Sequence, residues 1–144
     1  MVKRIFPIDQ FEKYFIPFSA HNVEYKGVLY QTAEHAYHSQ RYTDQKILEE
    51  IANARSAYIA WQTSQKYKSQ QISGFEEQKF KIMEDICRAK VQQHEDVKEA
   101  LIESGEDVIV KNYPDAIWGI GMDGSGRNEM GKIWMRLREE LRKK

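Results

Sequence analysis

The sequence has little cysteine and carries no surplus of charge of either sign. The single cysteine, Cys87, cannot form a disulfide within the chain, so no disulfide framework is expected. The 22 basic side chains are balanced by 22 acidic ones, which gives a net charge of zero. This balance argues against a general nucleic-acid-binding or membrane-surface protein and leaves room only for a local basic pocket.

Long hydrophobic runs are also missing. No apolar run approaches the ~20 residues that cross a bilayer, and the first ten residues, MVKRIFPIDQ, lack the apolar core of a signal peptide. We therefore expect a cytoplasmic protein with no membrane partner. A chain of 144 residues has the size of one domain with a proper core, so residues 1–144 are predicted to form a single domain.

The spacing of apolar residues predicts a mainly α (α+β) fold with one small β-hairpin. Residues 23–30, VEYKGVLY, predict two short strands that turn at Lys26-Gly27. Three helices are predicted in the first half: one from an N-cap at Thr32 to about Tyr42, one that starts after Thr43 or Asp44, and one around 57–61. Three more follow: a long helix from a capping box at 73–76 to about Gln93, one around 97–101, and one from about Asn128 onward.

The segment 115–131, DAIWGIGMDGSGRNEMG, is the most unusual part of the chain. It holds five glycines, one tryptophan, two aspartates and one asparagine. Because glycine loses the most conformational entropy on ordering, the segment indicates a close approach of backbone to another group, which we expect to be a ligand. Trp118 is either a core residue or a platform for a heterocycle, and Asn128 is expected to cap the last helix.

The helix after Thr32 carries three charged or titratable side chains on one face. Glu34, His38 and Arg41 fall at i, i+4 and i+7, with Tyr37 adjacent. One interpretation is a solvated polar face. The other is a carboxylate near a helix N-terminus, where the dipole favours the ionised form and where it would stabilise a developing cation in a ligand.

The long helix predicted to end near Gln93 places two lysines, Lys79 and Lys90, on or beside an apolar stripe that includes Phe75. Either their stems cover the edge of the core while the ammonium groups stay in water, or one or both enter a pocket. In a pocket, a lysine would serve as an anion contact or as a reactive amine.

Three other motifs do not predict a cofactor or metal. Residues 119–124 fit G-x-G-x-x-G, but only 20 residues follow the third glycine, which leaves no room for a dinucleotide-binding unit. His35 and His38 lack the i, i+4 spacing of a zinc helix. Cys87 is interpreted as a packing residue. We expect neither cofactor nor metal.

Four groups of residues occur in the order and approximate spacing of one known family. They are T-A-E-H-A-Y at 32–37; Phe75, Lys79 and Met83; R-A-K-V-Q-Q-H at 88–94; and D-x-x-W-G-x-G at 115–121 with Gly126, Asn128, Gly131 and Met135. In these motifs the chain resembles the NADAR family of YbiA-like proteins from about Phe15 to Leu141. Each motif is weak alone, whereas four in register are specific.

The resemblance implies a compact, mainly helical fold and an N-glycosidase activity. The family that the chain resembles is associated with hydrolysis of N-glycosidic bonds in early riboflavin-pathway intermediates, or with removal of ADP-ribose from modified guanine bases. The implied partner is therefore a small phosphorylated nucleoside-like substrate or an ADP-ribosylated nucleic-acid base. The residues that match the family motifs by position are Glu34, Phe75, Lys79, Lys90, Asp115, Trp118 and Asn128.

The chain departs from the family pattern at several positions. Pro17 stands in place of an asparagine, Arg41 in place of a lysine, and Phe75 in place of a tryptophan. The family's Gly-Arg pair is not evident around Ser64-Gln65. Because a guanidinium stays protonated and cannot form a Schiff base, Arg41 keeps the charge but not the amine chemistry. Substrate choice and turnover are left open by these changes.

Cleavage of a ribosyl N–C bond defines what a catalytic site must supply. Oxocarbenium character develops on the sugar and negative charge develops on the departing base. An anion is therefore needed near the sugar, and a proton or hydrogen-bond donor near the base. We hypothesise that Glu34 or Asp115 stabilises the cation or activates water. Lys79 would be the acid, or the nucleophile through a Schiff base.

The predicted substrate-binding residues are Tyr37, Arg41, Phe75, Lys90, Trp118, Gly119 and Asn128. Of these, Trp118 and Tyr37 are expected to stack on the base, and Arg41 and Lys90 to hold phosphate. The alternative function is a non-catalytic module that binds ADP-ribose or a nucleotide, which needs no working acid or base. The residues do not choose between the two substrates or define an oligomeric state.

Overall fold

The computed structural model of the chain describes residues 4–112 and 115–143. It divides the chain into two compact units. The middle unit is Pro17–Gln93, and the terminal unit combines the described parts of Met1–Ile16 and His94–Lys144. The expectation of one domain over the whole chain stays a prediction. No helix formed by residues 4–112 or 115–143 is long and apolar enough to cross a membrane.

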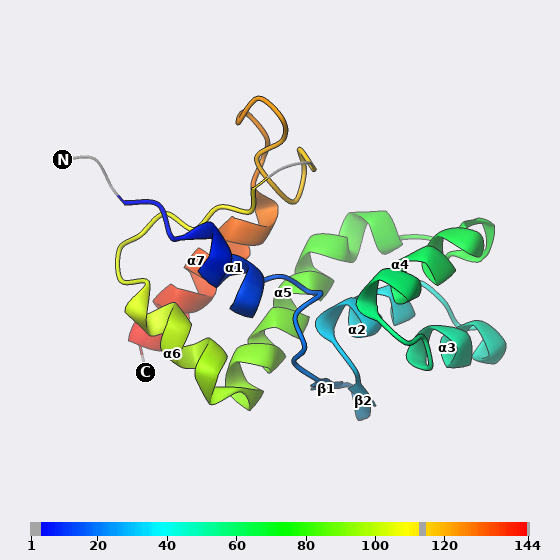
Figure 1. Cartoon of the computed structure of the whole chain (residues 1–144). Helices are drawn as coiled ribbons and strands as arrows, with labels where there is room; N and C mark the ends of the chain where they lie inside the picture. Colours follow the sequence, from blue (N-terminus) through cyan, green and yellow to red (C-terminus); the bar gives the residue numbers. More distant parts are fainter. Residues whose placement is uncertain (1–3, 113–114, 144) are drawn as a thin grey trace. The chain divides into compact units, whose positions relative to one another are not determined.

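The middle unit begins with the predicted hairpin and continues as helices (Figure 1). Its elements are β1 (Val23–Tyr25), β2 (Val28–Tyr30), α2 (Ala33–Ser39), α3 (Gln45–Ala52), α4 (Ala57–Lys66), the 3-10 turn η1 (Lys68–Gln70) and α5 (Phe75–Gln93). The strands pair antiparallel, with Val23 opposite Tyr30. Lys26 and Gly27 turn the chain with positive φ values of 52° and 82°, as a two-residue hairpin turn requires.

Side-chain caps define where the short helices begin. The Thr32 side chain accepts from the His35 N–H and Asp44 accepts from Lys46 and Ile47, which confirms Thr32 and selects Asp44 over Thr43. Helix α2 ends at Ser39, earlier than predicted, because the N–H groups of Gln40, Arg41 and Tyr42 bond three residues back instead of four.

Helix α2 is the central element of the middle unit. All seven of its residues are buried, and it contacts α3, α4 and α5 (Figure 1). Beside it lies an apolar cluster of Tyr42, Ile47, Ile51, Ala54 and Ala60, with Leu48 and Tyr67 packed against it. Polar residues of α2 therefore lie among other protein groups and do not form a solvated face.

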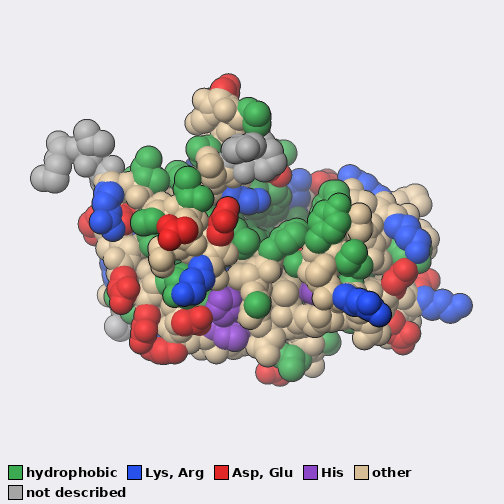
Figure 2. All heavy atoms as spheres, in the orientation of Figure 1, with side chains coloured by type: hydrophobic (Ala, Val, Ile, Leu, Met, Phe, Trp, Pro, Cys, Tyr) green, Lys and Arg blue, Asp and Glu red, His purple; other side chains and the backbone are tan. Residues whose placement is uncertain are grey.

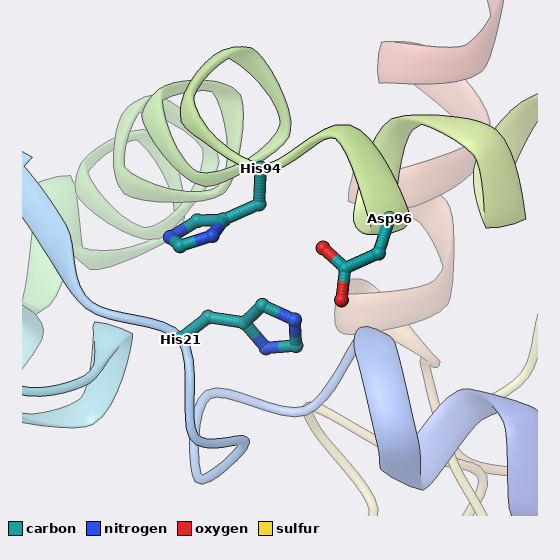
Figure 3. Close-up of side chains that lie close together, drawn as sticks. All are labelled: His21, His94 and Asp96. Atoms are coloured by element: carbon teal, nitrogen blue, oxygen red, sulfur yellow. The ribbon is translucent and has the colours of Figure 1, made fainter.

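The terminal unit is built from α1 (Ile8–Tyr14), α6 (Glu95–Glu103) and α7 (Glu129–Arg142), and α6 contacts both other helices. The Trp134 ring stacks on Phe15 at 4.7 Å between centroids, and its Nε1 donates to the Phe15 carbonyl at 2.9 Å. Helix α6 starts after His94, and Asp96 lies in its first turn (Figure 3). Asp96 Oδ1 accepts from the Val97 N–H.

The surface carries charges of both signs. On the face shown in Figure 2, acidic and basic side chains are interspersed, as the balanced composition predicts. The predicted fold class, mainly helical with one small hairpin, is confirmed.

Candidate functional site

Helix α2 carries the first candidate catalytic residue, Glu34, into the interior of the middle unit. Glu34 is 7% exposed, and its backbone N–H donates to the Pro17 carbonyl at 3.0 Å. Pro17, one of the departures from the family pattern, thus anchors the start of the helix through its carbonyl, which every residue type has. The predicted alternative of a solvated polar face is wrong for Glu34 and His38, because tertiary packing covers both.

His38 lies between Glu34 and Arg41 on the covered face of α2. Its Nε2 is 3.2 Å from Glu34 Oε1, and its Nδ1 accepts from Arg41 Nε at 3.0 Å. The contact with Glu34 falls short of an aligned hydrogen bond, so Nε2 is a buried atom without an aligned partner among the described residues. A buried donor left unpaired costs about 1–3 kcal/mol, which favours rotation of the carboxylate towards it.

Arg41 is held on both its polar edge and its flat face. Its Nη1 donates to Gln71 Oε1 at 2.6 Å. The guanidinium carbon lies 4.5 Å from the Phe75 ring centroid and 5.2 Å from that of Tyr37, distances typical of cation–π contact. Phe75 and Tyr37, predicted to bind substrate, are themselves buried at 1% and 3% exposure.

Glu76 at the start of α5 connects Arg41 to Lys79. Its carboxylate accepts from Lys79 Nζ at 2.9 Å and from Gln71 Nε2 at 3.1 Å, and it lies 3.7 Å from Arg41 Nη1. The hydrogen bond from Lys79, and then that from Gln71, hold the pKa of the Glu76 carboxyl below its usual value. The predicted capping box at 73–76 is wrong, because α5 begins at Phe75 and the Glu76 carboxylate accepts from the side chains of Lys79 and Gln71.

These contacts form one continuous set of polar side chains, which we call the Glu34–Lys79 network. Its members, in order of contact, are Glu34, His38, Arg41, Gln71, Glu76 and Lys79. The network joins an acidic group on α2 to a basic group on α5 within one unit. The Lys79 side chain is 19% exposed, so its charge is only partly open to solvent.

Lys90, the other lysine that the sequence placed beside the apolar stripe of α5, is fully covered at 1% exposure. Its Nζ donates to Ser19 Oγ at 2.6 Å, and Ser19 Oγ lies 2.8 Å from His21 Nδ1. Figure 3 shows His21 on the segment that precedes β1. The interpretation that both lysines keep their ammonium groups in water is thus wrong for Lys90, because Ser19 receives its ammonium inside the protein.

Two glycines of 115–131, Gly119 and Gly126, allow backbone to pack closely on backbone. A Cβ at Gly119 would lie 2.8 Å from the Lys111 carbonyl oxygen, and one at Gly126 would lie 2.5 Å from the carbonyl carbon of Ile120. Real Cβ atoms do not approach backbone so closely. The predicted close approach of backbone to another group is therefore seen at these two glycines, where the group is protein backbone, and the expected ligand stays a prediction.

Asp115 organises the start of the same loop. Its Oδ1 accepts from the N–H of Ile117 at 2.6 Å and from that of Trp118 at 2.9 Å, an Asx-turn arrangement. The turn fixes the backbone of Trp118, which is half-buried. Gly119, by contrast, is buried, and its N–H donates to the Asp115 carbonyl at 3.1 Å.

Asn128 stands at the N-cap position of α7 without capping the helix, which corrects its predicted role. It adopts a left-handed conformation (φ 54°, ψ 42°) with no side-chain cap bond. Its Oδ1 accepts from the Lys111 N–H at 2.8 Å and its Nδ2 donates to the Ile109 carbonyl at 2.9 Å. Loop carbonyls close the helix end instead, since Glu129 N–H donates to Ile117 and Met130 N–H to Trp118.

Sequence reasoning missed four members of these arrangements. Gln71, Glu76 and Ser19 were not singled out as site residues, and His38 was noted only as part of a helix face. The spacing of Glu34, His38 and Arg41 was the available signal for His38. Gln71 and Ser19 gave no signal, because Gln71 lies 30 residues from Arg41 and Ser19 lies 71 residues from Lys90.

The chain belongs to the NADAR family, since the NADAR domain model matches residues 7–142. The resemblance seen in the sequence is confirmed. The N-glycosidase YbiA of Escherichia coli (strain K12) is 30% identical over 128 residues, which cover 88% of this chain and 80% of that protein. The name N-glycosidase denotes a hydrolase of N-glycosyl bonds.

Two further comparisons extend this result. The NMR structure of the E. coli protein YbiA matches with a TM-score of 0.81 at 30% identity, covering 89% of this chain and 77% of that one. The riboflavin biosynthesis protein VVA0006 of Vibrio vulnificus (strain YJ016) is 31% identical over 121 residues. Those residues are 83% of this chain but only 33% of the Vibrio protein.

Proposed function

We propose that this chain is an N-glycosidase that hydrolyses the ribosyl N-glycosidic bond of a phosphorylated nucleoside-like substrate. The observation that carries the proposal is the Glu34–Lys79 network, which connects a buried carboxylate to an ammonium group by side-chain contacts. The names of the relatives, N-glycosidases and a riboflavin biosynthesis protein, support the reaction class.

Glu34 is the proposed partner of the sugar. As the C–N bond lengthens, the ribosyl carbon becomes cationic, and a carboxylate held at low exposure stabilises that charge more strongly than one in water. Water adds to this carbon and gives a proton to Glu34. Of the two carboxylates considered, Glu34 is favoured over Asp115, whose Oδ1 already accepts two loop N–H groups.

Lys79 is the proposed acid for the departing base. The Glu76 carboxylate binds the Lys79 ammonium at 2.9 Å. The ammonium donates its proton to the base nitrogen as the C–N bond breaks. The products are the free base and the ribosyl phosphate, and Glu34 returns its proton to the lysine. A Schiff-base route would instead require Lys79 to leave Glu76 and lose its proton before attack.

The remaining predicted residues take supporting roles in the proposal. Trp118 is the proposed stacking platform, and Asp115 and Gly119 shape the loop that presents it. Arg41 is a proposed phosphate contact through N–H groups beyond those that bond His38 and Gln71, with Phe75 and Tyr37 supporting its face.

The polar groups of Asn128 are bonded to backbone, which supports a structural role. Lys90 stays a candidate phosphate contact only if it releases Ser19.

The test is release of free base, followed by mass spectrometry. Purified protein is incubated separately with a ribosylamino-pyrimidine phosphate and with an oligonucleotide that carries ADP-ribosyl-guanine. The name of the Vibrio relative favours the first substrate. Glu34→Gln and Lys79→Met are each expected to lower turnover about 10²–10⁴-fold, as removal of a positioned base or acid does.

Matched controls come from exposed positions of α5. Glu77→Gln and Lys81→Met change the same residue types on α5 where the side chains are exposed, and both should turn over like the wild type. Wild-type turnover in Glu34→Gln and Lys79→Met would refute the residue assignment. Binding of ADP-ribose by folded protein, with no cleavage of either substrate, would instead establish the non-catalytic module.

A further inference from the structure

We infer that His38 is a positioning residue for Glu34, and that Arg41 sets the tautomer in which His38 acts. The inference rests on the proposed function, in which Glu34 meets the ribosyl cation. His38 itself contacts no reacting group in this assignment. It directs one N–H at the carboxylate and thereby decides how the carboxylate is turned.

The tautomer follows from the chemistry of the two neighbours. A guanidinium has N–H donors and no acceptor, so His38 Nδ1, which receives Arg41 Nε at 3.0 Å, carries no proton. The proton of the neutral ring is therefore on Nε2. That atom lies 3.2 Å from Glu34 Oε1, so the carboxylate is the acceptor within reach of this N–H.

The ring has little freedom to take another orientation. Its side chain is 3% exposed, and a flip would remove the acceptor of Arg41, which Gln71 and the Phe75 ring hold in place. The terminal torsion of a glutamate is broad, so the carboxylate is the adjustable partner. Because the Nε2–H has no aligned acceptor among the described residues, the carboxylate lowers the free energy of the pair by turning towards it.

A second histidine of α2 shows what a purely structural imidazole looks like here. His35 is fully buried, with Nδ1 2.8 Å from Thr32 Oγ1 and Nε2 3.0 Å from the Ala54 carbonyl oxygen. Both neighbours of His35 belong to a helix cap or to backbone. Both neighbours of His38 are side chains of the Glu34–Lys79 network, which distinguishes its role and makes His35 an internal reference.

Two substitutions separate positioning from packing. In His38→Gln the side-chain carbonyl accepts from Arg41 while the amide N–H donates to Glu34, whereas His38→Leu fills the space with neither. We expect His38→Leu to lower kcat about 10- to 100-fold with KM changed less than about 2-fold, and His38→Gln to stay within about 3-fold of wild type. A histidine that only fills space predicts the opposite order, with leucine tolerated better than glutamine.

The tautomer is measured directly and without turnover. Long-range ¹H–¹⁵N correlation spectra of the full chain should show the His38 proton on Nε2 and a bare Nδ1. In Arg41→Met the His38 signals should change to a mixture of tautomers while those of His35 stay unchanged. A wild-type His38 that carries its proton on Nδ1, or an unchanged His38 spectrum in Arg41→Met, would overturn the inference.

The outcomes distinguish this inference from the proposed function. If wild-type protein cleaves neither substrate, the proposed function fails, and the spectra alone decide the role of Arg41. If Glu34→Gln is inactive while His38→Leu turns over like wild type, only the positioning role of His38 fails. Should His38→Leu not fold, the tautomer spectra of the wild type and Arg41→Met decide, together with kcat of His38→Gln, for which a loss of about 10-fold or more would refute the inference.

Discussion

The guanidinium carbon of Arg41 lies 4.5 Å from the centroid of the Phe75 ring. These are two of the positions at which the chain departs from its family pattern, and they are in contact. Stacking needs a flat cation over an aromatic face, so arginine suits this position in a way that the compact ammonium of lysine does not. The two departures therefore form one local arrangement.

The first prediction concerns the free energy that couples Arg41 and Phe75. In a double-mutant cycle of Arg41→Met and Phe75→Leu, measured by urea unfolding, we expect a favourable coupling of about 0.5–2 kcal/mol. A matched cycle of Phe75→Leu with Lys81→Met, a largely exposed lysine of the same helix, should give none. Equal coupling in the two cycles would contradict the stacked arrangement.

A second prediction compares two glycines of the loop. A Cβ at Gly126 would lie 2.6 Å from the Gly119 carbonyl oxygen, whereas none of the described atoms lies within 4 Å of one at Gly124, whose φ is +80°. Gly126→Ala should cost about 3 kcal/mol through overpacking, and Gly124→Ala about 1 kcal/mol through backbone strain alone. Thermal unfolding of both variants tests the order. A larger loss for Gly124→Ala would show that the loop does not pack on itself.

The third prediction tests the structural role of Asn128. Asn128→Asp keeps the acceptor for the Lys111 N–H and the tolerance of a left-handed backbone but removes the donor to the Ile109 carbonyl. It should lower the free energy of unfolding by about 1–3 kcal/mol. Asp123→Asn, in an exposed turn of the same loop, is the control in urea unfolding. An unaffected Asn128→Asp protein would favour a ligand-binding role for this side chain instead.

The fourth prediction follows from the burial of Cys87. Burial raises the pKa of its thiol from 9.0 to about 12, so the thiolate is scarce near neutral pH and iodoacetamide should label the native protein far more slowly than the urea-unfolded chain. The unfolded thiol ionises first as pH rises. The free energy of unfolding should therefore fall between about pH 9 and 12, and Cys87→Ala should lack that component. Fast labelling of native protein would place the thiol at the surface.

The fifth prediction concerns acid stability at Glu76. Its pKa is lowered by the hydrogen bonds from Lys79 and Gln71, so its contribution to stability is present above the ordinary value near 4.5 and is lost as pH falls through the folded-state pKa. The side chain is half exposed, so solvent screening limits the contribution to less than about 1 kcal/mol. Glu76→Gln should flatten the acid limb of urea unfolding slightly, and Glu77→Gln should not. A steeper limb in Glu76→Gln would contradict the assigned sign.

The sequence alone predicted much of the local structure and part of the candidate site. Thr32 and Asp44 are short polar residues just before apolar-periodic segments, and each caps a helix as such residues do. The i, i+4 spacing brought Glu34 and His38 to one face of α2 because helical periodicity fixes that relationship before any tertiary contact forms. Arg41 follows in the turn after α2 and still contacts His38. The family motifs likewise depend on order and spacing along the chain, which is why the family was recognisable from residues alone.

Tertiary structure decided what those residues face. Whether a helix face is solvated or covered depends on which elements pack on it, and three helices cover α2. Asn128 has the residue type of a cap, but loop carbonyls accept from the first N–H groups of α7, and the Asn128 amide bonds Ile109 and Lys111 instead. Lys90 Nζ donates to Ser19 Oγ, which lies 71 residues away along the chain. Sequence periodicity reports only neighbours within a few residues, so partners brought together by chain folding are set by packing alone.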